Sequence, residues 1–128
     1  MVLVDSLKKY NHNCEVSFVK MTSYKSIQTT NGVKHLIGLN QNLEDRSLIV
    51  VEDIVDTENT IEELKVILKQ HNVKHFKIAT LFLKPEAYKK DIKLDYVGVR
   101  IPNKFIVGYG LDYDGLGRNL KEIYQISE

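Results

Sequence analysis

The amino-acid sequence predicts an α/β fold in which a parallel, twisted sheet is flanked by helices. The runs Ser47 to Val51 and Lys77 to Leu83 are mainly apolar, as expected of strands buried on both faces of a parallel sheet. Between them, residues 60–70 carry apolar side chains at positions 61, 64, 67 and 68, the spacing of a helix that packs on a sheet. This β-loop-α-β order predicts a right-handed crossover.

The elements before this unit have weaker patterns. Residues 1–10 are apolar at positions 1, 3, 4 and 7 and end near two lysines, which predicts the last turns of an amphipathic helix. Apolar and polar residues alternate from Cys14 to Met21, which predicts a strand with one solvent-exposed face. Residues 22–32 are rich in Ser, Thr, Gln and Asn and predict a mobile loop. A short extended piece is expected at 33–37.

The elements after it are two further strands, at Asp95 to Ile101 and Lys121 to Ile126, with a glycine-bearing segment at 108–117 between them. No repeat, low-complexity tract or linker interrupts the chain, so residues 1–128 are expected to form one domain.

Composition excludes several classes of function. A net charge of +1 provides no whole-molecule field for nucleic acid or an anionic membrane, so an anionic ligand must be held locally. No apolar run approaches the length that spans a bilayer. A single cysteine, Cys14, allows no intramolecular disulfide, which suits a reducing compartment. We therefore expect a cytoplasmic protein.

The predicted loop after the first buried strand, residues 52–60, concentrates groups that bind anions and cations. Two adjacent carboxylates, Glu52 and Asp53, are followed three residues later by Asp56. Hydroxyls then lead into a helix N-terminus, where free N–H groups and the helix dipole favour phosphate. Carboxylates beside a phosphate site suit sugar hydroxyls and Mg²⁺. The plainer alternative is that Asp56 or Thr57 only caps the helix.

Two segments carry a resemblance to a known family. Val51-Glu52-Asp53-Ile54-Val55-Asp56-Thr57 with Asn59-Thr60 resembles the phosphoribosyl pyrophosphate motif of type I phosphoribosyltransferases. The run from Ile101 to Tyr113 (Ile-Pro-Asn-Lys-Phe-Ile-Val-Gly-Tyr-Gly-Leu-Asp-Tyr), with Arg118 after it, resembles the purine-binding segment of the hypoxanthine-guanine branch. The chain is therefore similar to hypoxanthine-guanine phosphoribosyltransferases along its whole length.

The resemblance implies transfer of the 5-phosphoribosyl group of phosphoribosyl pyrophosphate to hypoxanthine or guanine, with Mg²⁺ as cofactor, in a homo-oligomer. Asp56 would be the catalytic base near purine N7. The phosphoribosyl group would be bound by Glu52, Asp53, Asp56, Thr57, Glu58, Asn59 and Thr60. The purine would be bound by Lys84, Phe105, Ile106 and Asp112. Arg118 would hold the pyrophosphate, and Ser23 and Tyr24 would belong to a flexible loop over the site. Glu52, Asp53 and Asp112 would address the metal.

By residue type alone, Lys84 would be a solvated lysine at a strand end, and Phe105 is as typical of a core as of a base-stacking site.

The sequence departs from the family's pattern at three places. Glu58 stands where the family has glycine, in a loop that must present N–H groups to a phosphate, and Arg100 stands where a carboxylate is common. Relative to the family, the chain is also expected to be N-terminally shortened and to lack a strand with its pyrophosphate-gripping loop. The alternative function is therefore an impaired or vestigial nucleotide-binding protein with little turnover.

Overall fold

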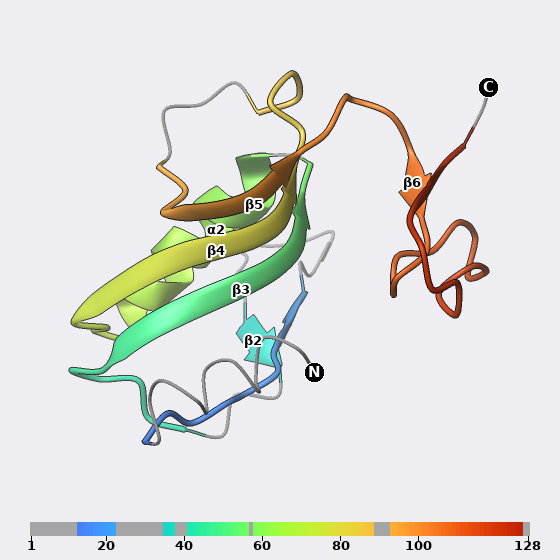
Figure 1. Cartoon of the computed structure of the whole chain (residues 1–128). Helices are drawn as coiled ribbons and strands as arrows, with labels where there is room; N and C mark the ends of the chain where they lie inside the picture. Colours follow the sequence, from blue (N-terminus) through green and yellow to red (C-terminus); the bar gives the residue numbers. More distant parts are fainter. Residues whose placement is uncertain (1–12, 23–34, 38–40, 57, 89–92, 127–128) are drawn as a thin grey trace, which may run out of the picture.

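The centre of the molecule is a parallel three-stranded sheet with a helix on one face (Figure 1). The computed structural model describes residues 13–22, 35–37, 41–56, 58–88 and 93–126. Strand β3 (Ser47–Val55) pairs with β4 (His75–Leu83), which pairs in turn with β5 (Tyr96–Arg100). Helix α2 (Glu58–Gln70) connects β3 to β4. The predicted α/β fold with a parallel sheet is confirmed.

The core lies between α2 and the sheet. The apolar stripe of the helix supplies Ile61, Leu64, Ile67 and Leu68, all nearly inaccessible to solvent. Ile61 packs with Val55, Ile78 and Leu83 near the carboxyl ends of the strands, and Leu64 and Leu68 pack with Leu43 near their amino ends. The helix turns that carry the stripe therefore fix the end of β3, which leads into the site.

The opposite face of the sheet is open among the described residues, and here the sequence-based expectation is wrong. Burial alternates along β3, so that Ile49 and Val51 are about half exposed, and Leu81 on β4 is 41% exposed. A continuous apolar run predicted burial on both faces. In the part of the chain that the structure describes, α2 covers only one of them (Figure 1).

The segment before β3 forms a small antiparallel pair, β1 (Lys20–Thr22) and β2 (His35–Ile37). The strand predicted over Cys14 to Met21 is thus confined to its end, because pairing begins only at Lys20, and residues 14–19 are irregular. The helix predicted over residues 1–10 and nearly all of the polar loop lie outside the described residues.

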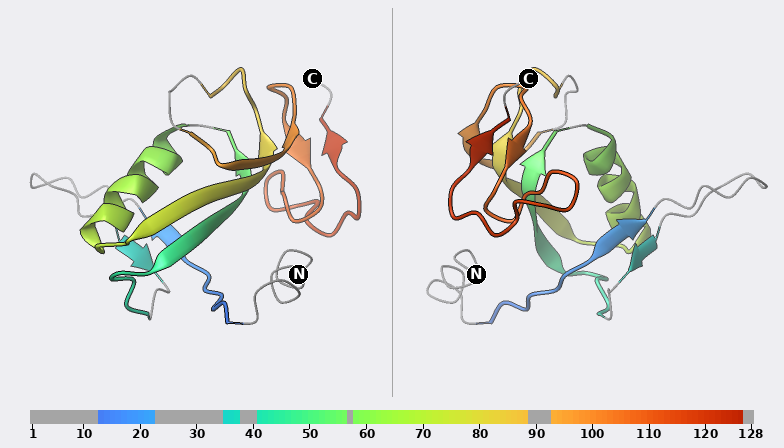
Figure 2. Two further views of the ribbon diagram at one scale, coloured as in Figure 1. Left: turned by 60° about the vertical axis from the view of Figure 1, so that its left-hand side comes forward. Right: turned by 90° about the vertical axis from the view of Figure 1, so that its right-hand side faces the viewer.

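The C-terminal segment forms a separate two-stranded unit, β6 (Ile106–Val107) with β7 (Tyr124–Gln125), which lies beyond the carboxyl ends of the parallel strands (Figures 1 and 2). Tight turns fill the chain between these strands, with glycines at positive φ at 108, 110, 115 and 117. The strand expected over residues 121–126 is only two residues long, because its pairing with β6 is confined to Tyr124 and Gln125. We name residues 105–126 the C-terminal unit.

Candidate functional site

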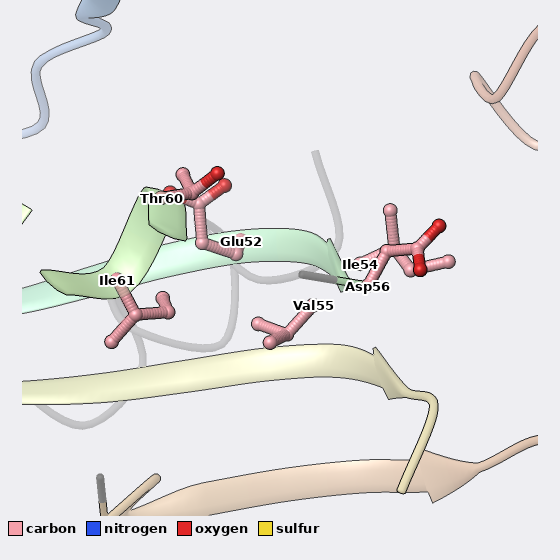
Figure 3. Close-up of a pocket in the computed structure, with 6 residues that line it drawn as sticks. All are labelled: Glu52, Ile54, Val55, Asp56, Thr60 and Ile61. Carbon is pink, nitrogen blue, oxygen red and sulfur yellow. The ribbon is translucent and has the colours of Figure 1, made fainter. Parts of the chain in front are cut away.

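A small pocket opens where β3 ends and α2 begins. It has a volume of about 80 Å³ and is lined by Glu52, Ile54, Val55, Asp56, Thr60 and Ile61 (Figure 3). The sequence placed these acidic residues in a loop, whereas β3 continues to Val55. The extension follows from pairing, since Ile54 and Val55 stay in register with Phe82 and Leu83.

Because Glu52 and Asp53 are neighbours in a strand, their side chains leave opposite faces of the sheet. Glu52 is the one that lines the pocket, and Asp53 is exposed. One oxygen of the Asp53 carboxylate also accepts a hydrogen bond from the backbone N–H of Ile54 at 2.8 Å. The two carboxylates therefore do not converge on one point.

Burial raises the pKa of Glu52 above its ordinary value, and the negative charge of Asp53 adds to the rise. A carboxyl group with a raised pKa holds a proton in the folded state over a pH range in which the unfolded chain has lost it. The free energy of unfolding therefore falls as pH rises through that range. A cation or a hydroxyl-rich ligand beside Glu52 would relieve this cost.

We expect Glu52→Gln to be more stable than the parent at pH 7 by up to about 1 kcal/mol, a figure discounted for partial exposure. The difference in stability should disappear when the pH is below 4.5, the ordinary pKa of a glutamate side chain. Urea unfolding at pH 4 and pH 7 measures it, and the exposed Glu86→Gln serves as the control. A Glu52→Gln variant equally stable or weaker at pH 7 would contradict the assignment of the cost to Glu52.

A buried cation, Lys84, directly follows β4 and contacts Asp56 at the edge of the pocket. The Lys84 side chain is 6% exposed, and its Nζ lies 2.9 Å from Oδ2 of Asp56, which is 49% exposed. The backbone N–H of Lys84 donates to the Val55 carbonyl, so the ends of β4 and β3 are tied together. The solvated strand-end lysine expected from residue type alone is therefore wrong, because Lys84 turns inward to pair with Asp56.

Helix α2 begins at Glu58, and its residues Thr60 and Ile61 line the pocket. Thr60 is exposed, and its hydroxyl lies on the pocket wall near Glu52 (Figure 3). The backbone of Glu58 is helical, a conformation open to any L-residue. Thr57, Ser23 and Tyr24, together with the side chains of Glu58 and Asn59, lie outside the described residues.

The C-terminal unit presents aromatic rings. Phe105 is about half exposed and makes an edge-to-face contact with Tyr113, with ring centroids 5.4 Å apart. Phe105 is therefore a surface ring rather than a core residue, which resolves the alternative left open by its residue type. Ile106 is partly buried in β6. Tyr113 has no role in the sequence-based interpretation, although an aromatic eight residues after Phe105 was visible there.

Asp112 and Arg118 meet in the same unit. Nη2 of Arg118 lies 2.5 Å from Oδ1 of Asp112, and Nη1 donates to the Gly110 carbonyl at 2.7 Å. The second oxygen of Asp112 accepts from the backbone N–H of Gly115 at 2.8 Å. Both oxygens of this expected metal ligand are thus already hydrogen-bonded.

The carboxylates fit Mg²⁺ only in part. Among the described residues, no group of three or more His, Cys, Asp or Glu side chains could hold a metal ion. Mg²⁺ commonly takes one or two carboxylates and completes its shell with substrate oxygens and water. Glu52, which is half-buried beside the pocket and has a raised pKa, could supply one such carboxylate. Asp53 diverges from it, and Asp112 would first have to leave Arg118.

The comparisons agree with this fold. The model of the phosphoribosyl transferase domain matches residues 1–114, which defines the class of protein. The hypoxanthine-guanine phosphoribosyltransferase of Streptococcus mutans is 39% identical over 127 residues, covering 98% of this chain and 71% of the relative. The chain therefore belongs to the hypoxanthine-guanine phosphoribosyltransferase family.

Solved structures extend the similarity. A hypoxanthine phosphoribosyltransferase from Staphylococcus aureus has a TM-score of 0.80 and 33% identity, covering 98% of this chain and 68% of that one. A Trypanosoma cruzi hypoxanthine phosphoribosyltransferase variant, complexed with the product IMP, has a TM-score of 0.81 and 31% identity, covering 98% and 63%. The similarity thus includes the C-terminal unit as well as the sheet.

Proposed function

We propose that this protein is a purine-salvage phosphoribosyltransferase that acts on hypoxanthine or guanine. It would break the bond between C1′ and the pyrophosphate of phosphoribosyl pyrophosphate and join C1′ to the purine, giving IMP or GMP and pyrophosphate. The observation that supports it best is the Lys84–Asp56 pair, a buried ammonium and a half-exposed carboxylate side by side at the carboxyl edge of the sheet. In open α/β sheets, ligands bind at that edge.

The pair matches one edge of a 6-oxopurine. Asp56 would accept the proton at N7, and the unused N–H groups of the Lys84 ammonium, which has three donors and no acceptor, would donate to O6. Phe105, an exposed ring in the C-terminal unit, would stack on the base, and Ile106 would offer backbone groups to its other edge. These roles agree with the chemistry of the groups.

The remaining roles follow the arrangement of charges. The pocket with Glu52, Asp56 and Thr60 would take the ribose 5-phosphate, its phosphate lying at the start of α2 beside Thr57 and Asn59. Arg118 would bind the pyrophosphate, for which a guanidinium fork is well shaped. Mg²⁺, when bound beside Glu52, would neutralise charge on the leaving pyrophosphate. Asp53, on the opposite face, and Asp112, bound to Arg118, are weaker candidates for that ion.

The setting of the enzyme is part of the proposal. No helix in the described part of the chain is long and apolar enough to cross a membrane. We propose a cytoplasmic enzyme that forms one domain over residues 1–128 and assembles as a homo-oligomer, a dimer or a tetramer.

Base preference tests the proposed function. Steady-state rates with hypoxanthine, guanine and adenine, each with phosphoribosyl pyrophosphate and Mg²⁺, should favour the two 6-oxopurines. The physical reason is that the Lys84 ammonium pairs with a carbonyl oxygen and repels an amino group, which typically separates such substrates by about 10⁴-fold. Adenine as the best substrate would contradict the proposal, and so would full activity without divalent cations.

A second candidate function is nucleotide binding with little turnover, and Glu58 is the observation that favours it. Glu58 is the first residue of α2, and the 5-phosphate is expected at the start of this helix. Like charges at about 4 Å cost roughly 4 kcal/mol at an effective dielectric of 20. Tight IMP binding with no detectable transfer would favour this candidate over the first.

We expect Glu58→Gly to tighten IMP binding, because it removes negative charge and bulk beside the phosphate. A gain of roughly 1–3 kcal/mol fits a partly screened pair of charges. Calorimetric titration of IMP into both proteins measures it, and added salt should reduce the difference by screening the repulsion. Unchanged affinity with a lower thermal midpoint would instead mean that Glu58 only supports the first turn of the helix, where acidic residues are favourable.

A further inference from the structure

The way in which Lys84 and Asp56 meet follows from the register of the sheet. Strands β3 and β4 pair with a constant offset of 28 residues, from Ser47 with His75 to Val55 with Leu83. Asp56 and Lys84 are also 28 residues apart, so they are the next pair in the same register. Their contact is therefore built on the most extensive pairing in the sheet and does not depend on a loop.

The two members of the pair are held very differently. Lys84 is buried, its N–H donates to the Val55 carbonyl, and its own carbonyl accepts from the N–H groups of Ala87 and Tyr88. Asp56 is half exposed and follows the last residue of β3. A half-exposed aspartate without a partner samples several staggered rotamers. The fixed ammonium removes that freedom by engaging Oδ2 of the carboxylate.

We propose that Lys84 is a positioning residue for Asp56, in addition to any contact that it makes with the base. The inference rests on the proposed function, in which Asp56 accepts a proton from the purine. With Oδ2 engaged by Lys84, the carboxylate presents Oδ1 to the ligand, and no bond to Oδ1 is recorded among the described residues. The position of the Asp56 carboxylate would affect the reaction rate, because misplacing a reacting group by about 1 Å can cost about 100-fold in rate.

The two roles of Lys84 predict different kinetics. A contact between Lys84 and O6 acts on the base directly, so its loss multiplies with the loss of Asp56. Positioning acts through Asp56, so its loss has little further effect once the carboxylate has been removed. A double-mutant cycle separates the two, because it measures whether the effects of neighbouring substitutions are independent.

The cycle compares the parent, Lys84→Met, Asp56→Asn and the double variant, with kcat for IMP formation as the measurement. We expect Lys84→Met to lower kcat by about 10–100-fold in the parent and by a factor at least about threefold smaller in the D56N background, where only the contact with O6 is left to lose. Lys84→Arg, which keeps a cation, should restore part of kcat. Lys74→Met, at an exposed lysine before β4, is the control and should match the parent. The same factor in both backgrounds would overturn the proposal.

A second measurement does not need turnover. A buried ammonium exchanges slowly with water, so the ¹⁵N resonance of Lys84, assigned by its loss in Lys84→Met, should be observable in the ligand-free protein. The resonance should shift or broaden in Asp56→Asn. It should stay in place in Asp53→Asn, which removes a carboxylate from the neighbouring strand β3. An unchanged resonance in Asp56→Asn would overturn the proposal.

The experiments distinguish failure of the proposed transferase function from failure of the positioning role of Lys84. A parent protein that transfers to neither 6-oxopurine removes the proposed function, and the resonance of Lys84 then decides the inference alone. Asp56→Asn leaves a buried ammonium without its charged partner, which is strongly destabilising. If that variant does not fold, Asp56→Glu takes its place in both measurements, because it keeps the charge and moves the carboxylate by one methylene.

Discussion

Replacing Asp56 by asparagine is expected to lower kcat for IMP formation by about 10²–10⁴-fold, the usual contribution of a general base. The amide keeps the shape of the side chain but cannot take a proton from the purine. Asp56 lines the pocket and follows the last residue of β3, and under the proposed function it would reach both the base and the phosphoribosyl group. The measurement is the steady-state rate with saturating phosphoribosyl pyrophosphate and hypoxanthine.

The control for this prediction is substrate affinity. The KM for phosphoribosyl pyrophosphate should change much less than kcat, because a proton acceptor acts chiefly in the transition state. Circular dichroism on the same samples checks that the variant is folded. A kcat within about tenfold of the parent in a folded variant, well short of the 10²–10⁴ range, would remove Asp56 from the role of base.

Gly108→Ala is expected to disrupt base binding more than any other glycine substitution in the C-terminal unit. Gly108 has φ of +107°, and an added Cβ would lie 2.0 Å from the backbone carbonyl oxygen of Glu122. Backbone cannot swing aside as a side chain can, so β6 and β7 must separate. The loss should exceed the roughly 1–3 kcal/mol that an unfavourable φ costs by itself. Calorimetric titration of IMP measures it.

Gly115→Ala is the matched control for this change. Gly115 also has a left-handed backbone, with φ of +80°, but an added Cβ would meet nothing within 4 Å. Both substitutions carry the conformational cost, and only Gly108→Ala adds the collision. Equal losses of IMP affinity in the two variants would show that the pairing of β6 with β7 does not support the site.

The sequence predicts the β3–α2–β4 unit within a few residues because each element has its own local pattern. The end of β3 escapes such an analysis, since carboxylates at positions 52 and 53 are typical of a loop, whereas pairing with β4 keeps them in a strand. The exposure of Ile49 and Val51 escapes it too, because an apolar run carries no information about how many faces of the sheet are covered.

The site divides in the same way. Residue types and motifs identify the charged groups, and the resemblance assigns roles to them, which remain proposals. The contacts between these groups are not encoded locally. Lys84 meets Asp56 through the register of two strands, and Arg118 meets Asp112 through turns built on glycines. Sequence patterns therefore predict candidate members of the site but not the partner that each one contacts.

The constant 28-residue offset between β3 and β4 also has a consequence for the order of folding. A strand, a helix and a strand that are close in sequence lose little chain entropy when they meet, so we expect β3–α2–β4 to form early. Asp56 and Lys84 would come together at that stage, whereas Phe105 and Arg118 would be positioned only when the C-terminal unit folds. During synthesis, the charged pair proposed to distinguish 6-oxopurines from adenine would thus exist before the ring proposed to stack on the base and the guanidinium proposed to bind pyrophosphate.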